Sequence, residues 1–410
     1  MISQTEQSIL RYDADTVLKT YKKDHILFDE KYFESEIEAL SILNGSKHFI
    51  DAYEVGDCSY RMKRYNFSLG TADKLNYIAV SRVLFSLGID EILKNLDLIL
   101  RELRKSKIAH RDINPGNLLY SQKERLLKLT DFFWCSNNGK TPLPEQSTNH
   151  PWPVNGKYGT DDSKAIDKIK AEIKFFYESY FMPKCEIITN DFITTVGCGN
   201  YKDGSSVFEG FAYHVVDIPQ FKESIKYHKN TCINEYQTIK DNMPIEPKSL
   251  IDIGMACGYF TFNLLRDFNI NHCIGFEADV GVNRFLCEVN NLYSQSIDIW
   301  GKFDHTISFK EKDEYDIAIF LNSHMWLYKQ LGREKTLECV KNILNHCRYM
   351  FFQTCGAYSS GMYKVMEYKS YVDIRQMLYD AGAKKVANIG EFVGSHDAPR
   401  HMFLVRGQVE

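Results

Sequence analysis

The feature that most constrains the fold is the segment 248–258, which reads KSLIDIGMACG. An apolar strand runs here into a turn of small residues, and a helix is expected over 259–267. The turn has the pattern Asp252-x-Gly254-x-Ala256-x-Gly258. Small side chains let backbone N–H groups and the helix N-terminus come close to a polar ligand. The segment therefore predicts an α/β layer that binds a ligand at this turn.

A second strand is expected over 272–276, and it runs directly into Glu277. An acidic residue about nineteen residues beyond the glycine turn is placed to accept hydrogen bonds from the two hydroxyl groups of a ribose. The same geometry serves dinucleotides. The pattern by itself therefore leaves a dinucleotide-dependent oxidoreductase open as one interpretation of this half of the chain.

The residues that follow alternate between expected strands and helices, as an α/β fold requires. A buried strand over 314–323 runs into Asn322 and His324. A long helix to residue 347, a strand over 349–354, a helix over 370–381 and strands over 385–392 and 401–406 complete the series. With the glycine pattern, this order resembles the class I S-adenosylmethionine-dependent methyltransferases. The middle glycine of their first motif is replaced here by Ala256.

The resemblance implies a Rossmann-like domain with S-adenosylmethionine as its cofactor. His324, after the fourth strand, is expected to act as a base or to orient an acceptor oxygen. A structural histidine is the alternative. The cofactor-binding residues that the resemblance implies are Asp252, Gly254, Ala256, Gly258, Glu277 and Asn322.

A second motif, His-Arg-Asp-Ile-Asn-Pro-Gly-Asn over 110–117, organises the first half of the chain. It places Asn117 five residues after Asp112, which is the spacing of a phosphotransferase catalytic loop. Asp112 would meet the attacking hydroxyl, and Asn117 would hold a metal ion on the nucleotide phosphates. Asp131, at the end of an apolar strand, is the second expected metal ligand. The alternative is a turn with a salt-bridged aspartate.

Earlier residues fit the same chemistry. Two strands are expected within 8–21, and the second carries Lys19; the helix expected over 28–43 carries Glu36. A strand lysine that holds phosphates and is oriented by a helix glutamate is typical of kinases. Two further strands lead to a linker at Lys63 and Tyr65, where a nucleotide base would bind to backbone groups.

Residues 1 to about 180 thus resemble the protein-kinase-like superfamily, including its aminoglycoside and lipopolysaccharide phosphotransferases. The resemblance implies an α+β fold with ATP and Mg²⁺ as cofactors. Two departures stand out, since no glycine precedes Gly45 and Phe133 replaces the glycine of Asp-Phe-Gly. Only about fifty residues follow Asp131 before the next domain, so the second lobe is expected to be short and the substrate to be a small molecule or a glycan.

The expected organisation is a kinase-like domain over 1–184, a bridge over 185–245 and a methyltransferase domain over 246–410. Within the bridge, β-type alternation broken by glycines over 185–217 favours hairpins. A helix is expected over 221–240, because Pro244 and Pro247 prevent its continuation.

Composition limits the class of partner and the compartment. A net charge of −4 gives no bulk attraction to nucleic acid, although local basic patches leave peripheral membrane contact open. No apolar run is long enough for a transmembrane segment and no export signal is recognisable, so a cytoplasmic location is expected. The 11 cysteines include no Cys-x-x-Cys pair, which indicates reduced thiols rather than a structural zinc site.

Together the two halves predict a bifunctional enzyme that phosphorylates and methylates a glycan or a small molecule. The combination resembles the kinase-methyltransferases that cap bacterial O-antigen polysaccharides, with the domain order reversed. A role in polysaccharide biosynthesis would follow from that resemblance. The alternative is a methyltransferase whose kinase-like module is inactive and serves as scaffold or regulator.

Overall fold

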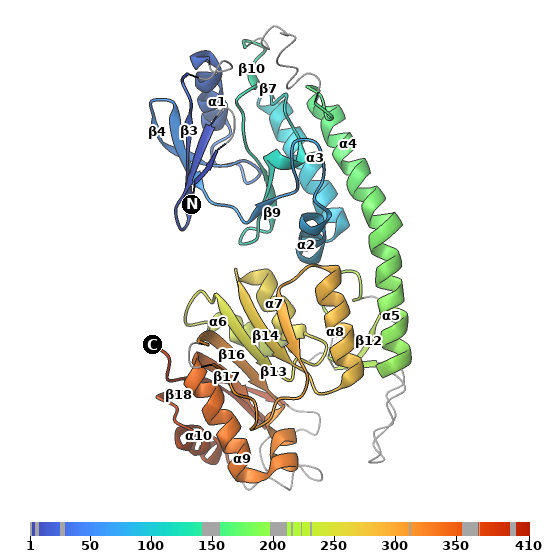
Figure 1. Ribbon diagram of the computed structural model, residues 1–410, viewed down its shortest axis with the longest axis vertical. Helices are drawn as coiled ribbons and strands as arrows, with labels where there is room; N and C mark the ends of the chain where they lie inside the picture. Colours follow the sequence, from blue (N-terminus) through green and yellow to red (C-terminus); the bar gives the residue numbers. More distant parts are fainter. Residues whose placement is uncertain are drawn as a thin grey trace. The chain divides into compact units, whose positions relative to one another are not determined.

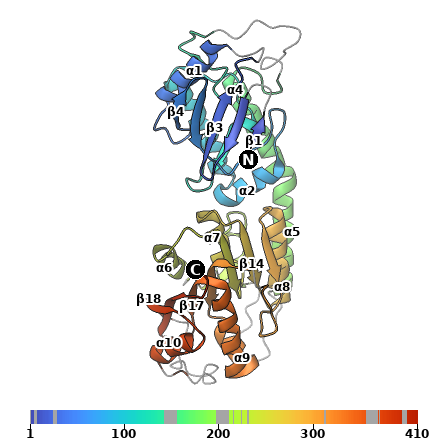
Figure 2. The same cartoon turned by 60° about the vertical axis from the view of Figure 1, so that its left-hand side comes forward.

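The computed structural model describes residues 2–4, 8–24, 29–141, 156–196, 211–214, 216–222, 224–229, 232–310, 313–354, 368, 370–393 and 399–410. The chain forms two compact units, Met1–Pro183 and Lys184–Glu410. Figure 1 shows the first unit in blue to green and the second in green to red, and Figure 2 shows the same elements turned by 60°.

The first unit begins with a five-stranded antiparallel sheet of order β1-β2-β3-β5-β4. The strands predicted within 8–21 are confirmed as β2 and β3, and Leu10 pairs with Lys19 across them. Helix α1 starts at an Asp29 cap that accepts from the Lys31 N–H. The bounds are β1 Ile2–Gln4, β2 Ser8–Tyr12, β3 Thr16–Tyr21, α1 Glu30–Ile42, β4 Ala52–Gly56 and β5 Ser59–Lys63.

The rest of this unit contains helices and short strands. In α3 the buried side chains Ile92, Leu96, Ile99 and Leu103 recur at helical spacing, so one face packs inward. The helix begins directly after Gly88, so Asp90 lies inside its first turn. The bounds are β6 Phe67–Ser68, α2 Tyr77–Leu87, α3 Ile89–Lys105, β7 Ile108–Ala109, β8 Leu118–Ser121, β9 Leu126–Leu129, β10 Ser136–Asn137 and α4 Asp162–Phe176.

The second unit is built on a seven-stranded sheet of order β15-β14-β13-β16-β17-β19-β18. The pairs from β15 to β17 are parallel, and β19 runs antiparallel to both of its neighbours. The predicted Rossmann-like α/β sheet is confirmed. The bounds are β13 Ser249–Ile253, α7 Tyr259–Asp267, β14 His272–Phe276, α8 Val280–Leu292, β15 Ile297–Trp300, β16 Tyr315–Leu321, α9 His324–His346, β17 Cys347–Gln353, α10 Tyr371–Asp380, β18 Lys385–Val393 and β19 Pro399–Arg406.

The core of this unit lies along the central strands. Phe320, Phe352 and Phe403 come from three neighbouring strands, and none of them is exposed. Strands covered on both faces read as continuous apolar runs, which explains the sequence YDIAIFL of β16. The connecting helices cover the sheet, with α8 against β15, α9 against β17 and α10 against β18.

The predicted bridge over 185–245 differs from the structure. Residues 185–196 belong to a helix, α5 Met182–Val196, which continues from α4 through a π-helical turn Tyr177–Phe181. Strands β11 Phe211–His214 and β12 Lys226–Lys229 pair in parallel, so they do not form a hairpin. The helix predicted over 221–240 is shorter, α6 Cys232–Asp241. The predicted hairpin glycines 197, 199, 204 and 210 lie outside the described residues.

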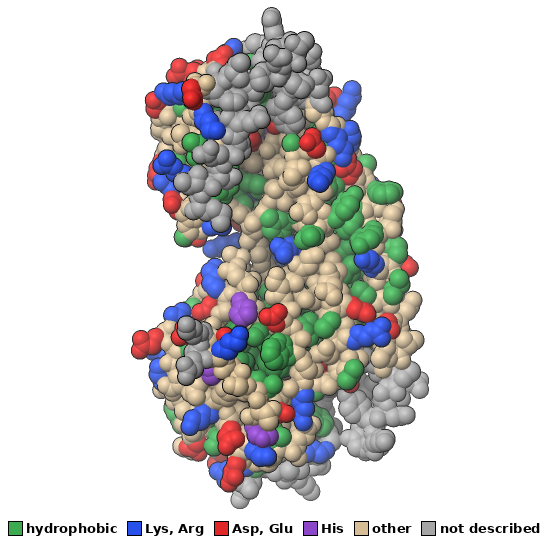
Figure 3. Space-filling view, in the orientation of Figure 1, with side chains coloured by type: hydrophobic (Ala, Val, Ile, Leu, Met, Phe, Trp, Pro, Cys, Tyr) green, Lys and Arg blue, Asp and Glu red, His purple; other side chains and the backbone are tan. Residues whose placement is uncertain are grey.

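The surface charge, the character of the helices and the burial of the thiols can be compared with the expectations from composition. On the described part of the face in Figure 3, acidic and basic side chains are interspersed and form no basic stripe. None of the helices among the described residues combines the length and apolar character needed to cross a bilayer. Of the nine cysteines that the structure describes as free thiols, Cys287 is half-buried and the other eight are buried.

Candidate active sites

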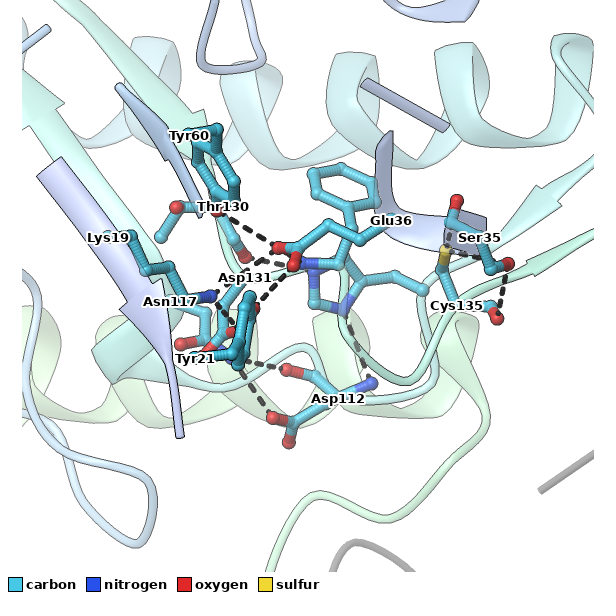
Figure 4. Close-up of polar contacts among 12 residues, drawn as sticks. Lys19, Tyr21, Ser35, Glu36, Tyr60, Asp112, Asn117, Thr130, Asp131 and Cys135 are labelled. Atoms are coloured by element: carbon cyan, nitrogen blue, oxygen red, sulfur yellow. Dashed lines mark hydrogen bonds and ion pairs between the residues drawn. The ribbon is translucent and has the colours of Figure 1, made fainter. Parts of the chain in front are cut away.

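The side chain of Lys19, on β3, is buried and extends toward Asp131 and Glu36 in the first unit (Figure 4). Its Nζ atom is 2.7 Å from Asp131 Oδ1 and 3.4 Å from Glu36 Oε1. Burial disfavours the Lys19 ammonium, but the two carboxylates outweigh burial and raise its pKa. Burial likewise opposes ionisation of Asp131, and Lys19 overcomes this and lowers the Asp131 pKa. The Lys19–Asp131 pair is therefore ionised.

Glu36 on α1 is held by more donors than Lys19 alone. Tyr60 Oη donates to Glu36 Oε1 at 3.0 Å, the Phe132 N–H donates to the same oxygen at 3.0 Å, and Tyr21 Oη donates to Oε2. Burial raises the Glu36 pKa, while Lys19 and the two tyrosines oppose that rise. These contacts fix the carboxylate and the helix that carries it. Sequence reasoning missed both tyrosines.

Asp112 is held in a tight turn by two carboxamides. Asn114 Nδ2 donates to its Oδ1 at 3.0 Å, and Asn117 Nδ2 donates to its Oδ2 at 3.1 Å. Asn114 Oδ1 also accepts from the backbone N–H groups of Gly116 and Asn117, which closes the short 3₁₀ turn Pro115–Asn117. Burial, then the charge of Asp131, raises the Asp112 pKa well above its usual range. A carboxylate with a raised pKa is a stronger proton acceptor.

The loop that carries Asp112 is anchored from α4. The Asp162 carboxylate accepts from the backbone N–H groups of His110 and Arg111, both at 2.7 Å. Arg111 has a φ of 66°, a left-handed conformation that costs free energy in a non-glycine residue. Asp162 therefore positions the loop that carries Asp112. Sequence reasoning did not single out Asp162.

Asn117 and Asp131 are neighbours, because the Thr130 N–H donates to the Asn117 carbonyl oxygen at 3.0 Å. Asn117 uses its amide nitrogen to bond Asp112, which leaves its side-chain oxygen as the atom that would bind a metal ion. Among the described residues, no group of three His, Cys, Asp or Glu side chains could hold a metal ion. Mg²⁺ commonly uses one or two protein oxygens together with substrate phosphates, so Asn117 and Asp131 fit it.

Five predicted residues thus gather at one place, namely Lys19, Glu36, Asp112, Asn117 and Asp131 (Figure 4). The predicted base-binding residues Lys63 and Tyr65 make other contacts. Lys63 Nζ pairs with Glu124 at 3.0 Å, and Lys128 lies over the Tyr65 ring at 5.7 Å. The structure gives neither side chain a contact with the five.

The second unit carries the glycine turn between β13 and α7. Gly254, Ala256 and Gly258 all have positive φ, at 78°, 48° and 76°. The Ala256 N–H donates to Glu277 Oε2 at 2.7 Å, and the Asp279 N–H donates to Oε1 at 2.8 Å. Burial raises the Glu277 pKa, against these backbone bonds. A carboxylate held here can still accept hydrogen bonds from a vicinal diol through its remaining lone pairs.

Asp252, on β13, supports this turn through a contact with α7. Only 2% of its surface is exposed, and Thr261 on α7 donates to its carboxylate. Burial, opposed by the Thr261 bond, raises the Asp252 pKa to about 7. The buried carboxyl group joins β13 to α7. It therefore supports the turn, and its contact with a cofactor stays a prediction.

Asn322 and His324 lie where β16 passes into α9. Asn322 Nδ2 donates to Gln353 Oε1 at 2.8 Å, and His324 Nδ1 is 3.3 Å from Thr354 Oγ1. Burial lowers the pKa of His324 to about 3, which keeps the ring neutral. So low a pKa makes His324 a weak base, and its geometry suits orienting a neighbour better. The residue between them, Ser323, has its Oγ in the space that a Cβ on Gly254 would take.

No protein-family model matches the chain. Solved structures similar to it include the bifunctional kinase-methyltransferase WbdD, with 13% identity and a TM-score of 0.39 over 48% of this chain and 44% of WbdD. The N-terminal domain of EvdMO1 with SAH and D-fucose matches at 11% identity and a TM-score of 0.36, over 45% of this chain and 86% of that domain. This chain spans less than half the length of the WbdD structures. At these scores the similarity establishes neither a shared family nor a shared activity.

Proposed function

We propose that the second unit is an S-adenosylmethionine-dependent methyltransferase. Its strand order, with an antiparallel strand inserted before the last, is that of the class I enzymes that the sequence resembles. The observation that carries the proposal is the 2.7 Å bond from the Ala256 N–H to Glu277, which joins the glycine turn of one strand to the acidic end of the next. Ribose and sulfonium nucleoside ligands suit that juxtaposition.

The proposal gives Glu277 and the glycine turn separate roles in binding the cofactor. Glu277 accepts the ribose hydroxyls, and the backbone from Gly254 to Gly258 lies against the rest of the nucleoside. Asn322 lies at the end of β16, beside this turn. When bound, S-adenosylmethionine supplies a methyl group on a sulfonium. The protein aligns the acceptor for in-line displacement and excludes water.

We propose further that the first unit is a phosphotransferase for a glycan or small-molecule hydroxyl. It carries Lys19 on the third strand of a β1-β2-β3-β5-β4 sheet and Glu36 on the helix that follows, as kinase-like folds do. Asp112 accepts the proton of the attacking hydroxyl, and Lys19 contacts phosphate oxygens. Asn117 and Asp131 would hold Mg²⁺, and ATP, when bound, supplies the phosphoryl group.

An inactive kinase-like module is the second candidate for this unit. The absence of glycine before Gly45 favours it, because backbone without glycine approaches phosphate less closely. The gathering of Lys19, Glu36, Asp112, Asn117 and Asp131 supports activity instead. A module kept only as a scaffold would not need these five side chains together.

Two measurements separate these candidates. Calorimetry of the full chain with S-adenosylmethionine and with NAD should show binding of the former, and binding of NAD alone would remove the methyltransferase proposal. Nucleotide turnover by the wild type should exceed that of Asp112→Asn and Asp131→Asn by a large factor. Equal rates in all three proteins would favour the scaffold.

Mass spectrometry then identifies the acceptor. Candidate glycans and small molecules are incubated with the chain, ATP, Mg²⁺ and S-adenosylmethionine. An added phosphate, an added methyl group or both would assign each unit its reaction, and one molecule carrying both groups would show that the two units share a substrate.

A further inference from the structure

A buried polar cluster lies at the carboxyl ends of β16 and β17, and it shares only Asn322 with the residues expected to bind the nucleoside. It consists of Glu235 on α6, Asn322, Gln353 and Arg400 on β19, and is called here the Glu235 cluster. Gln353 is fully buried and Glu235 is 2% exposed. Asn322 and Gln353 are joined twice, by the 2.8 Å side-chain bond and by the Asn322 N–H, which donates to the Gln353 carbonyl at 2.8 Å.

Three polar atoms of the Glu235 cluster lack a hydrogen-bond partner among the described residues. They are Glu235 Oε2, Gln353 Nε2 and Asn322 Oδ1. Arg400 and Gln353 lie close enough to favour the ionised form of Glu235, yet neither completes a hydrogen bond to Oε2. Buried polar atoms are rarely left unpaired, since each costs about 1–3 kcal/mol. Gln353 Nε2 lies toward Glu235, but its NH₂ group has two N–H donors, so the cluster still presents two acceptors and one donor for a ligand to satisfy.

The Glu235 cluster adjoins the glycine turn. Asn322 precedes Ser323 in the chain, and Ser323 Oγ fills the space above Gly254. The ligand of the cluster would therefore lie beside the nucleoside proposed for that turn. This is the place where a methyl acceptor must lie.

The charges of the cluster indicate the class of acceptor. Glu235 and Arg400 carry opposite charges, and the remaining members are amides, so the cluster is neutral as a whole. A phosphate, a carboxylate or an ammonium group would bring an unbalanced charge into a buried site. A hydroxyl group can donate to Glu235 or Asn322 and accept from Gln353.

Resting on the proposed methyltransferase function, we propose that the Glu235 cluster binds the methyl acceptor. The acceptor is a neutral polyhydroxylated compound, such as a glycoside, and Glu235 takes the proton of its hydroxyl group. The acceptor oxygen forms a bond to the methyl carbon as the carbon–sulfur bond breaks. The sulfonium becomes a neutral thioether, and the hydroxyl proton passes to Glu235 Oε2. Burial raises the Glu235 pKa, which makes this carboxylate a better base.

The test uses the full chain, S-adenosylmethionine and three acceptor probes: methyl glycosides of neutral hexoses, the corresponding hexose phosphates, and a polyamine. Mass spectrometry should find a methyl group on the glycosides. Glu235→Gln should lower kcat/KM by about 100-fold or more and remove its rise with pH, as loss of a general base does. Gln353→Met should mainly raise KM. The S-adenosylmethionine Kd should stay within about twofold in both variants, since neither residue contacts the nucleoside.

The control is Asp241→Asn, which removes an exposed carboxylate from the same helix and should change none of these values. Thermal unfolding of each variant shows whether it is folded. If Glu235→Gln is not folded, Glu235→Asp is used, and the pH profile should then persist.

The outcomes distinguish the two proposals. A wild-type chain that does not bind S-adenosylmethionine contradicts the proposed function itself. If the wild type binds it, the acceptor proposal is overturned by methylation of phosphates or amines alone, by no methylation of any glycoside, or by an unchanged kcat/KM in Glu235→Gln. Loss of S-adenosylmethionine binding in the variants also overturns it, because the cluster would then hold the cofactor instead.

Discussion

Lys19 Nζ lies nearer to Asp131, at 2.7 Å, than to Glu36, at 3.4 Å. The lysine proposed for phosphate binding is therefore paired with the carboxylate proposed for Mg²⁺. A divalent ion on Asp131 would compete with Lys19 for that carboxylate and would release the ammonium toward phosphate. Metal and nucleotide binding should consequently favour each other, as linked equilibria do.

Replacing Asp131 separates these effects. Asp131→Asn should reduce nucleotide turnover by at least about 100-fold, because the metal loses its carboxylate. It should also leave Lys19 with Glu36 as its carboxylate partner in place of two, so that metal-free nucleotide binds as well as or better than it does to the wild type. Calorimetry with and without Mg²⁺ measures both effects. Asp57→Asn breaks the exposed Lys23–Asp57 pair and should change neither. A Mg²⁺ effect that persists in Asp131→Asn would contradict the linkage.

Asp112→Asn should remove the proposed proton acceptor and leave the chain folded. The amide is the same size as the carboxylate, and turnover should fall by about 10²- to 10⁴-fold, the usual contribution of a general base. Nucleotide binding should change little, because the role proposed for Asp112 is to contact the acceptor. Asp90→Asn, on the exposed first turn of α3, is the matched control. Turnover that stays at the wild-type rate would remove Asp112 from the mechanism.

Tyr60 and Tyr21 should stabilise the site through Glu36. Tyr60→Phe leaves a buried carboxylate oxygen with one donor fewer and should lower the free energy of unfolding by about 1.5–3 kcal/mol. The partly exposed Tyr53→Phe should lie within about 0.5 kcal/mol of the wild type. Urea denaturation of both variants is the measurement. Equal effects of the two substitutions would show that the Tyr60–Glu36 bond adds no stability.

The glycine turn can be tested with three alanine variants. Gly254 and Gly332 share a φ of 78°, but a Cβ would overlap Ser323 at Gly254 and meets only open space at Gly332. Gly332→Ala should cost about 1–2 kcal/mol, and Gly254→Ala should cost more and also weaken S-adenosylmethionine binding. Gly301→Ala, with neither strain nor contact, should be near neutral. Denaturation and calorimetry report the two quantities, and intact binding in Gly254→Ala would remove the turn from the cofactor site.

Asp252 should make the second unit less stable as the pH rises. Its pKa is about 7 in the folded chain against an ordinary 3.8, so the folded state binds the proton more tightly. The resulting stabilisation is complete below about pH 4 and is lost as the pH rises through about 7. Asp252→Asn should flatten this dependence and be more stable at pH 8, by at most about 4 kcal/mol. Urea midpoints across pH 5–8 test it, with the exposed Asp298→Asn as control. A wild-type midpoint that rises over this range would contradict the assignment.

Local patterns predicted much of the fold. The apolar run of β16 and the strand pattern within 8–21 are short-range signals, and these strands formed where expected. Residues 185–196 were misassigned because β-branched residues, such as Ile187, Ile188 and Thr189, favour strands. Their apolar spacing, with Cys185, Ile188 and Phe192 buried, fits a helix instead. Periodicity outweighed propensity in that segment.

The candidate sites were predictable only in part for the same reason. The residues around Asp112 and Gly254 belong to compact motifs, whereas Tyr60 reaches Glu36 from 24 positions away. Gln353 and Glu235 are likewise remote in sequence from Asn322, and nothing in their local sequence marks them. Such partners depend on the packing of the sheet, which a one-dimensional pattern does not contain.

The reactivity of the buried thiols reports whether each unit of the protein is folded. Cys58 and Cys135 lie in the first unit and the other seven described thiols in the second, all but Cys287 shielded in the folded chain. Among these nine thiols, a thiol reagent should therefore modify Cys287 first and reach the others only when their unit opens. Mass mapping of the labelled peptides would time the opening of each half separately in one sample, without any engineered probe.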